Sequence, residues 1–94
     1  MVIARVTFPG LDQGGRQTPP RSGYHPQVAI GGEYTSCVLE SLDGEAIFAF
    51  GRAYRVSLRL LFPERYPDAF AVGTSLRFYE GSHLVGSGVV LEIT

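Results

Sequence analysis

The chain has 94 residues, which suits one domain (residues 1–94) with a small hydrophobic core. Its 45% hydrophobic and 18% charged residues exclude a disordered chain, and its single cysteine, Cys37, excludes an internal disulfide. The net charge of −1 gives no overall attraction to nucleic acid, and all eight basic residues are arginine, so the lysine of P-loop, kinase-type and Schiff-base sites is absent.

Alternating apolar and polar side chains, typical of strands with one buried face, recur along the chain. The first predicted strand is Met1 to Phe8. The stretch from Pro9 to Gly23 has no periodicity, and a loop of this length in a small domain is usually functional or disordered. Tyr24 to Ile30 is the second predicted strand.

Tyr34 to Leu42 is the third predicted strand, and Asp43-Gly44 has the composition of a hairpin turn. The fourth strand is then expected at Ala46 to Phe50. The clearest alternation follows at residues 54–62, where five large apolar side chains are expected on one buried face: Tyr54, Val56, Leu58, Leu60 and Phe62.

Leu76 to Tyr79 and Leu84 to Ile93 form a predicted closing hairpin, after an irregular connection from Pro63 to Gly73. The glycines of Gly86-Ser87-Gly88 indicate a bulge or a close approach between strands. About seven short strands with one buried face each predict an all-β fold, a closed antiparallel barrel that leaves no exposed sheet edge.

Catalytic and metal-binding motifs are weak. Gly73 to Arg77 begins like a nucleophile elbow, but Arg77 stands where the second glycine belongs. His25 and His83 are too few for a convincing metal site, and Cys37 is expected to be a small buried hydrophobe. The sequence therefore predicts no enzyme, no catalytic or metal-binding residues, and no cofactor. With no long apolar segment, it also predicts a cytoplasmic protein without a membrane partner.

Two blocks of sequence resemble the third, C-terminal domain of elongation factor Tu. Residues 14–19 (Gly-Gly-Arg-Gln-Thr-Pro) and 23–27 (Gly-Tyr-His-Pro-Gln) are similar to its Gly-Gly-Arg-His-Thr-Pro and Gly-Tyr-Arg-Pro-Gln, and residues 76–90 resemble its closing hairpin. The resemblance covers nearly the whole chain. It implies a six- or seven-stranded antiparallel barrel without the GTP-binding domain, so no nucleotide is expected to bind this chain.

In that factor, the barrel helps to grip the T-stem backbone of aminoacyl-tRNA, packs against the GTPase domain and meets the nucleotide-exchange factor. The resemblance places Gln27, Ser36 (or its neighbour Thr35) and Gly81 at RNA-contacting positions. Amides, hydroxyls and backbone N–H groups can donate to phosphate or ribose without identifying bases. Arg16 and Arg21 are expected to assist this surface, and Arg16 is also expected to organise the long loop or an inter-domain contact.

The sequence departs from the family where Phe62 and His83 replace cationic side chains. Two hypotheses stay open, and a small-barrel enzyme of unknown type is a minor third alternative. The chain is either a module that binds tRNA or other structured RNA, or a protein-interaction module that docks a translation GTPase, an exchange factor or another protein. The uneven distribution of charge along the chain is also open to two interpretations, solvated faces or one basic surface opposite an acidic one.

Overall fold

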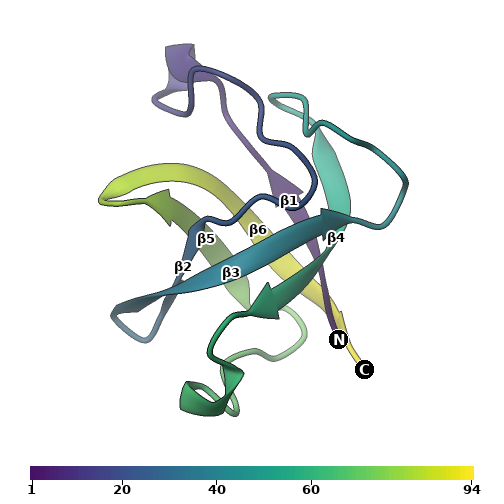
Figure 1. Cartoon of the computed structure of the whole chain (residues 1–94), viewed down its shortest axis with the longest axis vertical. Coiled ribbons are helices and arrows are strands. Elements are labelled where there is room, and N and C mark those ends of the chain that lie inside the picture. Colours follow the sequence, from purple (N-terminus) through teal and green to yellow (C-terminus); the bar gives the residue numbers. More distant parts are fainter.

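The computed structural model describes all 94 residues, and six antiparallel strands close into a barrel (Figure 1). The strands are β1 (Val2–Thr7), β2 (Gln27–Ile30), β3 (Glu33–Ser41), β4 (Ala53–Leu60), β5 (Ser75–Glu80) and β6 (His83–Ile93). Around the barrel they follow the order β1-β4-β3-β2-β5-β6, and β6 pairs again with β1. The predicted all-β closed barrel is confirmed.

The two ends of the barrel carry different segments (Figure 1). The first, called here the loop end, holds the β1–β2 connection with the 3₁₀ turn η1 (Leu11–Gln13) and the β3–β4 connection. The second, the termini end, holds both chain ends and the 3₁₀ turn η2 (Pro63–Arg65). None of the helical turns has the length or apolar character to cross a bilayer.

Apolar side chains from every strand fill the barrel, as the period-two pattern predicts. The predicted face of β4 is largely confirmed, because Tyr54, Val56 and Leu58 are all buried. At the loop end, Phe8 lies 5.7 Å from Phe48 and 5.8 Å from Tyr24 between ring centroids. This aromatic cluster closes one end of the core and supports the loop that crosses it.

The predicted strand at residues 46–50 is wrong. Only Ile47 forms a bridge there, with Arg21, and the segment joins no sheet ladder. Its backbone groups bond to the neighbouring loop instead, since Phe48 N–H donates to Pro20 O at 2.9 Å. The fully buried Phe48 ring explains the apolar composition of this segment, because it plugs the end of the barrel.

The prediction that Phe62 shares the buried face of β4 is also wrong. The strand ends at Leu60, and Phe62 is 49% exposed. Pro63 begins η2 and has no N–H to donate to a sheet ladder, and Phe62 before it has φ −127° and ψ 63°, outside the extended region, so the alternation stops before it reaches Phe62.

Gly86 and Gly88 lie where β6 passes close to β1, as the sequence predicts. A Cβ on Gly86 would lie 2.6 Å from a ring carbon of Phe8, and one on Gly88 would lie 2.4 Å from the carbonyl oxygen of Arg5. These positions have no room for a side chain.

Candidate nucleic-acid interface

Arg16 fastens the long β1–β2 loop to the turn between β5 and β6. Its Nε lies 3.1 Å from Glu80 Oε2, and its guanidinium lies 4.8 Å from the centroid of the Tyr24 ring. Tyr24 Oη donates a hydrogen bond to the same carboxylate oxygen. Arg16 therefore neutralises the charge of Glu80 within the site, although Glu80 lies near the surface.

Tyr24 and His83 hold this arrangement in place. Burial is the main reason that the pKa of Tyr24 lies well above its ordinary value, and the hydrogen bond to Glu80 adds to the shift. Tyr24 therefore remains a neutral donor at physiological pH. On the other side of the turn, His83 Nε2 lies 2.5 Å from the carbonyl oxygen of Gly14. Because that carbonyl can only accept, this nitrogen is the donor.

Two adjoining hollows lie along the fastened loop and are named here together as the loop groove. One has a volume of about 410 Å³ and the other about 330 Å³, and Arg16 and Thr18 line both. Arg21 lines the second hollow, whereas Gln17 and His83 line the first. The structure thus brings the two predicted arginines, Arg16 and Arg21, into one groove.

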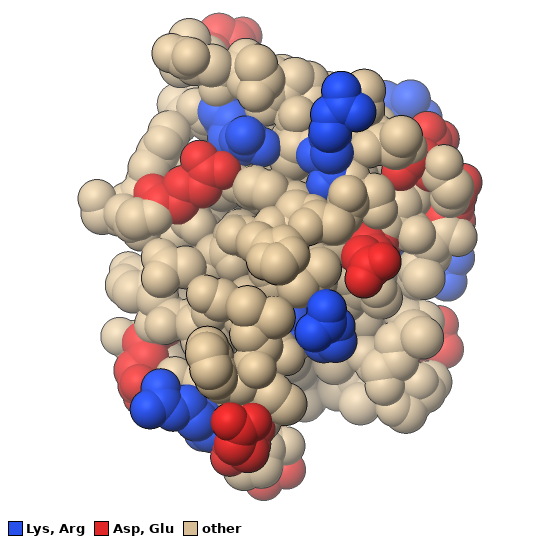
Figure 2. All heavy atoms as spheres, in the orientation of Figure 1, with Lys and Arg blue, Asp and Glu red and all other residues tan.

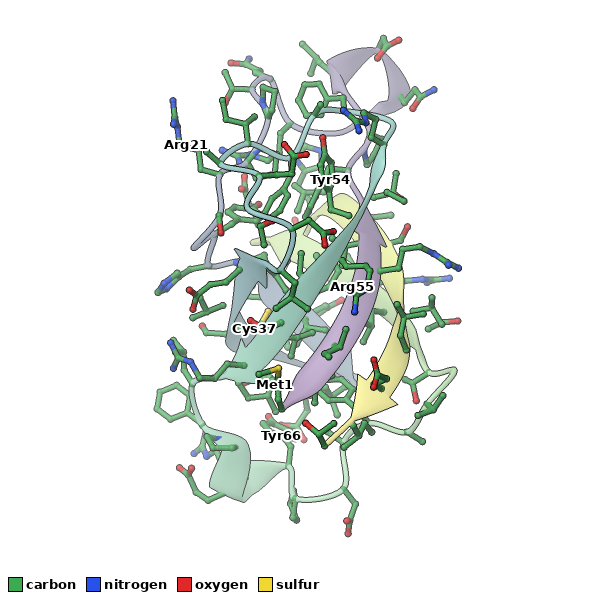
Figure 3. All side chains as sticks on the ribbon, turned by 90° about the vertical axis from the view of Figure 1, so that its right-hand side faces the viewer. Met1, Arg21, Cys37, Tyr54, Arg55 and Tyr66 are labelled. Carbon is green, nitrogen blue, oxygen red and sulfur yellow. The ribbon has the colours of Figure 1, made fainter.

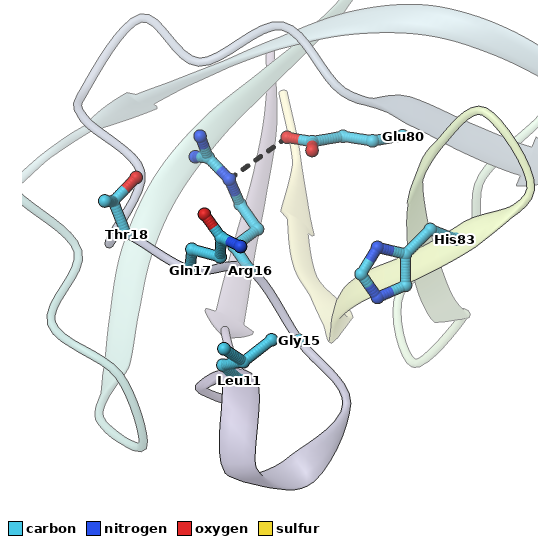
Figure 4. Close-up of a pocket in the computed structure, with 7 residues that line it drawn as sticks. All are labelled: Leu11, Gly15, Arg16, Gln17, Thr18, Glu80 and His83. Carbon is cyan, nitrogen blue, oxygen red and sulfur yellow. Dashed lines mark ion pairs between the residues drawn. The ribbon is translucent and has the colours of Figure 1, made fainter.

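The free end of Arg16 is available to a ligand. Only its Nε is engaged with Glu80, and the two terminal nitrogens point away from that carboxylate (Figure 4). Arg21 is exposed and makes no ion pair. The groove therefore offers a planar guanidinium fork and a second cation, with hydroxyl and amide groups beside them, which is a donor set suited to phosphate.

Gln27 and Ser36 lie directly opposite each other on β2 and β3, and both are partly exposed. Gln27 also pairs with Tyr79 on β5, so Gly81 follows two residues farther along, in the β5–β6 turn. The barrel therefore brings these three predicted residues to one wall, next to the loop groove. Thr35 is buried and pairs with the core residue Val28, so Ser36 is the hydroxyl on the outer surface.

Two further tyrosines lie on this wall and were not among the predicted site residues. Tyr34 and Tyr79 meet edge to face with ring centroids 4.9 Å apart, and Tyr34 is 53% exposed. Tyr34, Tyr79, Gln27 and Ser36 are called here the tyrosine platform. One feature of the sequence could have identified Tyr34 as a surface residue. It alternates in phase with the polar residues Ser36 and Glu40, which places it on the outer face of its strand.

Both signs of charge are interspersed on the face that carries the platform, so the hypothesis of one basic surface does not describe this face (Figure 2). Basic side chains gather toward its loop end, above β2 and β3 (Figure 2). Part of the charge is internally matched, since Arg16 pairs with Glu80 and Arg55 lies 3.6 Å from Asp43. Unpaired cations such as Arg21 therefore offer a ligand their full charge, while Arg16 offers the donors of its two free terminal nitrogens.

No three or more His, Cys, Asp and Glu side chains come together in a group that could hold a metal ion. A scan of the sequence against protein-family models finds no match.

Proposed function

We propose that this chain is a non-catalytic module that binds the backbone of RNA, in the way its resemblance to the third barrel of elongation factor Tu suggests. The observation that carries this proposal is the meeting of two surfaces at the β5–β6 turn. The loop groove contributes Arg16 and Arg21, and the neighbouring wall contributes Gln27, Ser36 and Gly81.

These groups suit phosphate and ribose. The terminal nitrogens of Arg16 can donate two parallel hydrogen bonds to one phosphate, and Arg21 adds a second positive charge. The Gln27 amide, the Ser36 hydroxyl and the N–H of Gly81 are donors that need no particular base. Gly81 has φ of 62° and nothing stands within 4 Å of where a Cβ would lie, so a ligand can approach that side of its backbone.

Affinity for tRNA is expected to be modest and to depend on salt. Only two arginines, Arg16 and Arg21, line the loop groove, and each phosphate that an arginine neutralises contributes about −0.7 to −0.9 to the slope of log affinity against log salt. The expected partner is tRNA or another structured RNA, with no bound nucleotide or cofactor.

The test is a titration of tRNA followed by fluorescence anisotropy over a series of salt concentrations. Arg21→Ala is expected to weaken binding and to reduce the salt slope by about 0.7–0.9. Arg65→Ala is the matched control, because Arg65 is an exposed arginine in η2 at the termini end. An absence of tRNA binding at low salt, or equal effects of the two substitutions, would contradict the proposal.

A second candidate function, docking of a translation GTPase, an exchange factor or another protein, has support at the termini end. A hollow of about 250 Å³ there has six hydrophobic residues among its lining: Val2, Arg59, Leu60, Pro63, Tyr66, Pro67, Ala69, Phe70 and Ile93. Exposed Met1, Leu61 and Phe62 add apolar surface. Tyr66 and Met1 lie at the end of the barrel opposite Arg21 (Figure 3).

An affinity capture performed with and without nuclease distinguishes the two candidate functions. Protein docking predicts a captured partner that survives nuclease, is lost with Phe62→Ser and is kept with Arg21→Ala. RNA binding predicts the reverse: captured material sensitive to nuclease and to Arg21→Ala. If neither substitution changes what is captured, neither the loop groove nor the apolar surface at the termini end is the binding surface.

A further inference from the structure

The contact between Tyr34 and Tyr79 depends on a small residue between them. Tyr34 pairs with Ala29 on β2, while Tyr79 pairs with Gln27 on the other edge of that strand. The tyrosines therefore stand diagonally across β2. Because Ala29 has a single methyl group, the two rings can meet over it with centroids 4.9 Å apart.

The pair leaves aromatic surface uncovered. Tyr34 is 53% exposed, and Leu84, which pairs with Tyr79 on β6, is 45% exposed. Neither tyrosine hydroxyl makes a hydrogen bond within the protein, unlike those of Tyr24, Tyr54 and Tyr66. A fixed aromatic surface with free polar edges costs little side-chain entropy when it binds a planar ligand.

The side of the platform formed by β2 and β5 favours an anionic partner, whereas β3 adds the exposed carboxylate of Glu40 four residues beyond Ser36. The outward side chains on β2 and β5 include one arginine and no carboxylate: Gln27, Ala29, Ser75, Arg77 and Tyr79. Arg77 is exposed and unpaired. The carboxylate at the end of β5, Glu80, is held by Arg16 and Tyr24.

We propose that the tyrosine platform stacks an unpaired base of single-stranded RNA, while Arg77 meets the adjoining phosphate. This inference rests on the proposed RNA-binding function and adds a substrate class to it, because a backbone-only surface would not distinguish single strands from duplexes. Bases within a duplex are stacked on each other and present no free face, whereas aromatic stacking is open to any unpaired base. Gln27 and Ser36 stand beside the stacked base to donate to its ribose.

The test uses a single-stranded RNA of about eight nucleotides that contains 2-aminopurine, and a duplex of the same sequence. The wild-type protein is expected to bind the single strand more tightly and to quench 2-aminopurine fluorescence. Tyr34→Ala is expected to weaken single-strand binding about 5- to 150-fold, the range typical of one stacked base, and to abolish quenching. Tyr34→Phe keeps the ring and is expected to retain both.

Phe62→Ala is the matched control, since it removes an aromatic ring of similar exposure at the termini end. If RNA binds but prefers the duplex, shows no quenching, or is indifferent to Tyr34→Ala, the platform inference is overturned and the proposed function stands. If the wild type binds neither RNA, the proposed function itself is overturned. Quenching by the wild-type protein needs no variant, so the inference can be tested even if Tyr34→Ala does not fold.

Discussion

Gly88 sets how closely β6 can approach β1. A Cβ there would lie 2.4 Å from the carbonyl oxygen of Arg5, and a backbone atom in a paired strand cannot move aside cheaply. We expect Gly88→Ala to lower the free energy of unfolding by about 1–3 kcal/mol or more. Urea denaturation followed by circular dichroism measures the change.

The matched control is Ser87→Ala, because Ser87 is the exposed neighbour of Gly88 on β6. This change is expected to stay within about 0.5 kcal/mol of the wild type. Equal stability of the two variants would show that β1 and β6 are not in close contact at Gly88.

Ionisation of Cys37 is expected to lower the free energy of unfolding as the pH rises above 9.0. The thiol is fully buried and donates to Pro26 O at 3.6 Å, and burial raises its pKa from 9.0 to about 12. Its contribution to stability is therefore fully present below pH 9.0 and is lost as the pH rises toward about 12, because the unfolded chain ionises first.

Urea denaturation of the wild type and Cys37→Ala on both sides of pH 9.0 tests this prediction. The wild type is expected to lose more stability than the variant as the pH rises, since the tyrosines titrate in both. At neutral pH the native thiol is expected to react with a disulfide reagent only as fast as the protein opens. Rapid reaction without denaturant would contradict the buried position of Cys37.

At the scale of elements, the β1–β2 loop is ordered by a few contacts. Arg16 joins it to Glu80, and the Gly14 carbonyl accepts from His83. We expect Arg16→Ala to raise hydrogen exchange across residues 10–23 and to speed cleavage by trypsin after Arg21, because local opening then costs less.

Arg77→Ala is the control, because it removes an exposed arginine on β5 that makes no ion pair to the loop. Exchange across residues 10–23 should be the same in this variant as in the wild type. If Arg16→Ala also leaves the loop as protected as before, then packing of Pro20 and Tyr24 alone holds it.

The strands could be predicted because burial of one face imposes a period of two on the sequence. The prediction failed where apolar residues serve another purpose: the segment with Phe48 plugs the core, and Phe62 lies outside it. Neither use has a period, so composition alone could not separate them from strand residues.

The candidate site was only partly predictable. The family resemblance placed Gln27 and Ser36 at RNA-contacting positions, but their adjacency depends on the register of β2 with β3, which was not predicted. The meeting of Tyr34 and Tyr79 depends on strands that are neighbours in the barrel but distant in the chain. The side-chain pattern along a sequence does not predict which residues meet diagonally across neighbouring strands.

At the scale of the whole molecule, most contacts between residues join parts of the chain that are far apart in the sequence. β1 is flanked by β4 and β6, and β2 by β3 and β5. Because loop closure must precede these contacts, we expect refolding in the millisecond-to-second range typical of small barrels. Stopped-flow tyrosine fluorescence can follow it without interference, since the chain has no tryptophan. Microsecond folding would mean that local contacts dominate instead.

Because β1 pairs with β6, the barrel cannot close until the last strand has been synthesised. During synthesis, β1 leaves the ribosome well before β4 and long before β6, so neither of its partners is present when it emerges. An unpaired strand with apolar residues is a template for aggregation. Until β6 is made, the growing polypeptide exposes apolar surface and unpaired strand edges of the kind that chaperones cover. A product truncated before β6 exposes the edges of both β1 and β5.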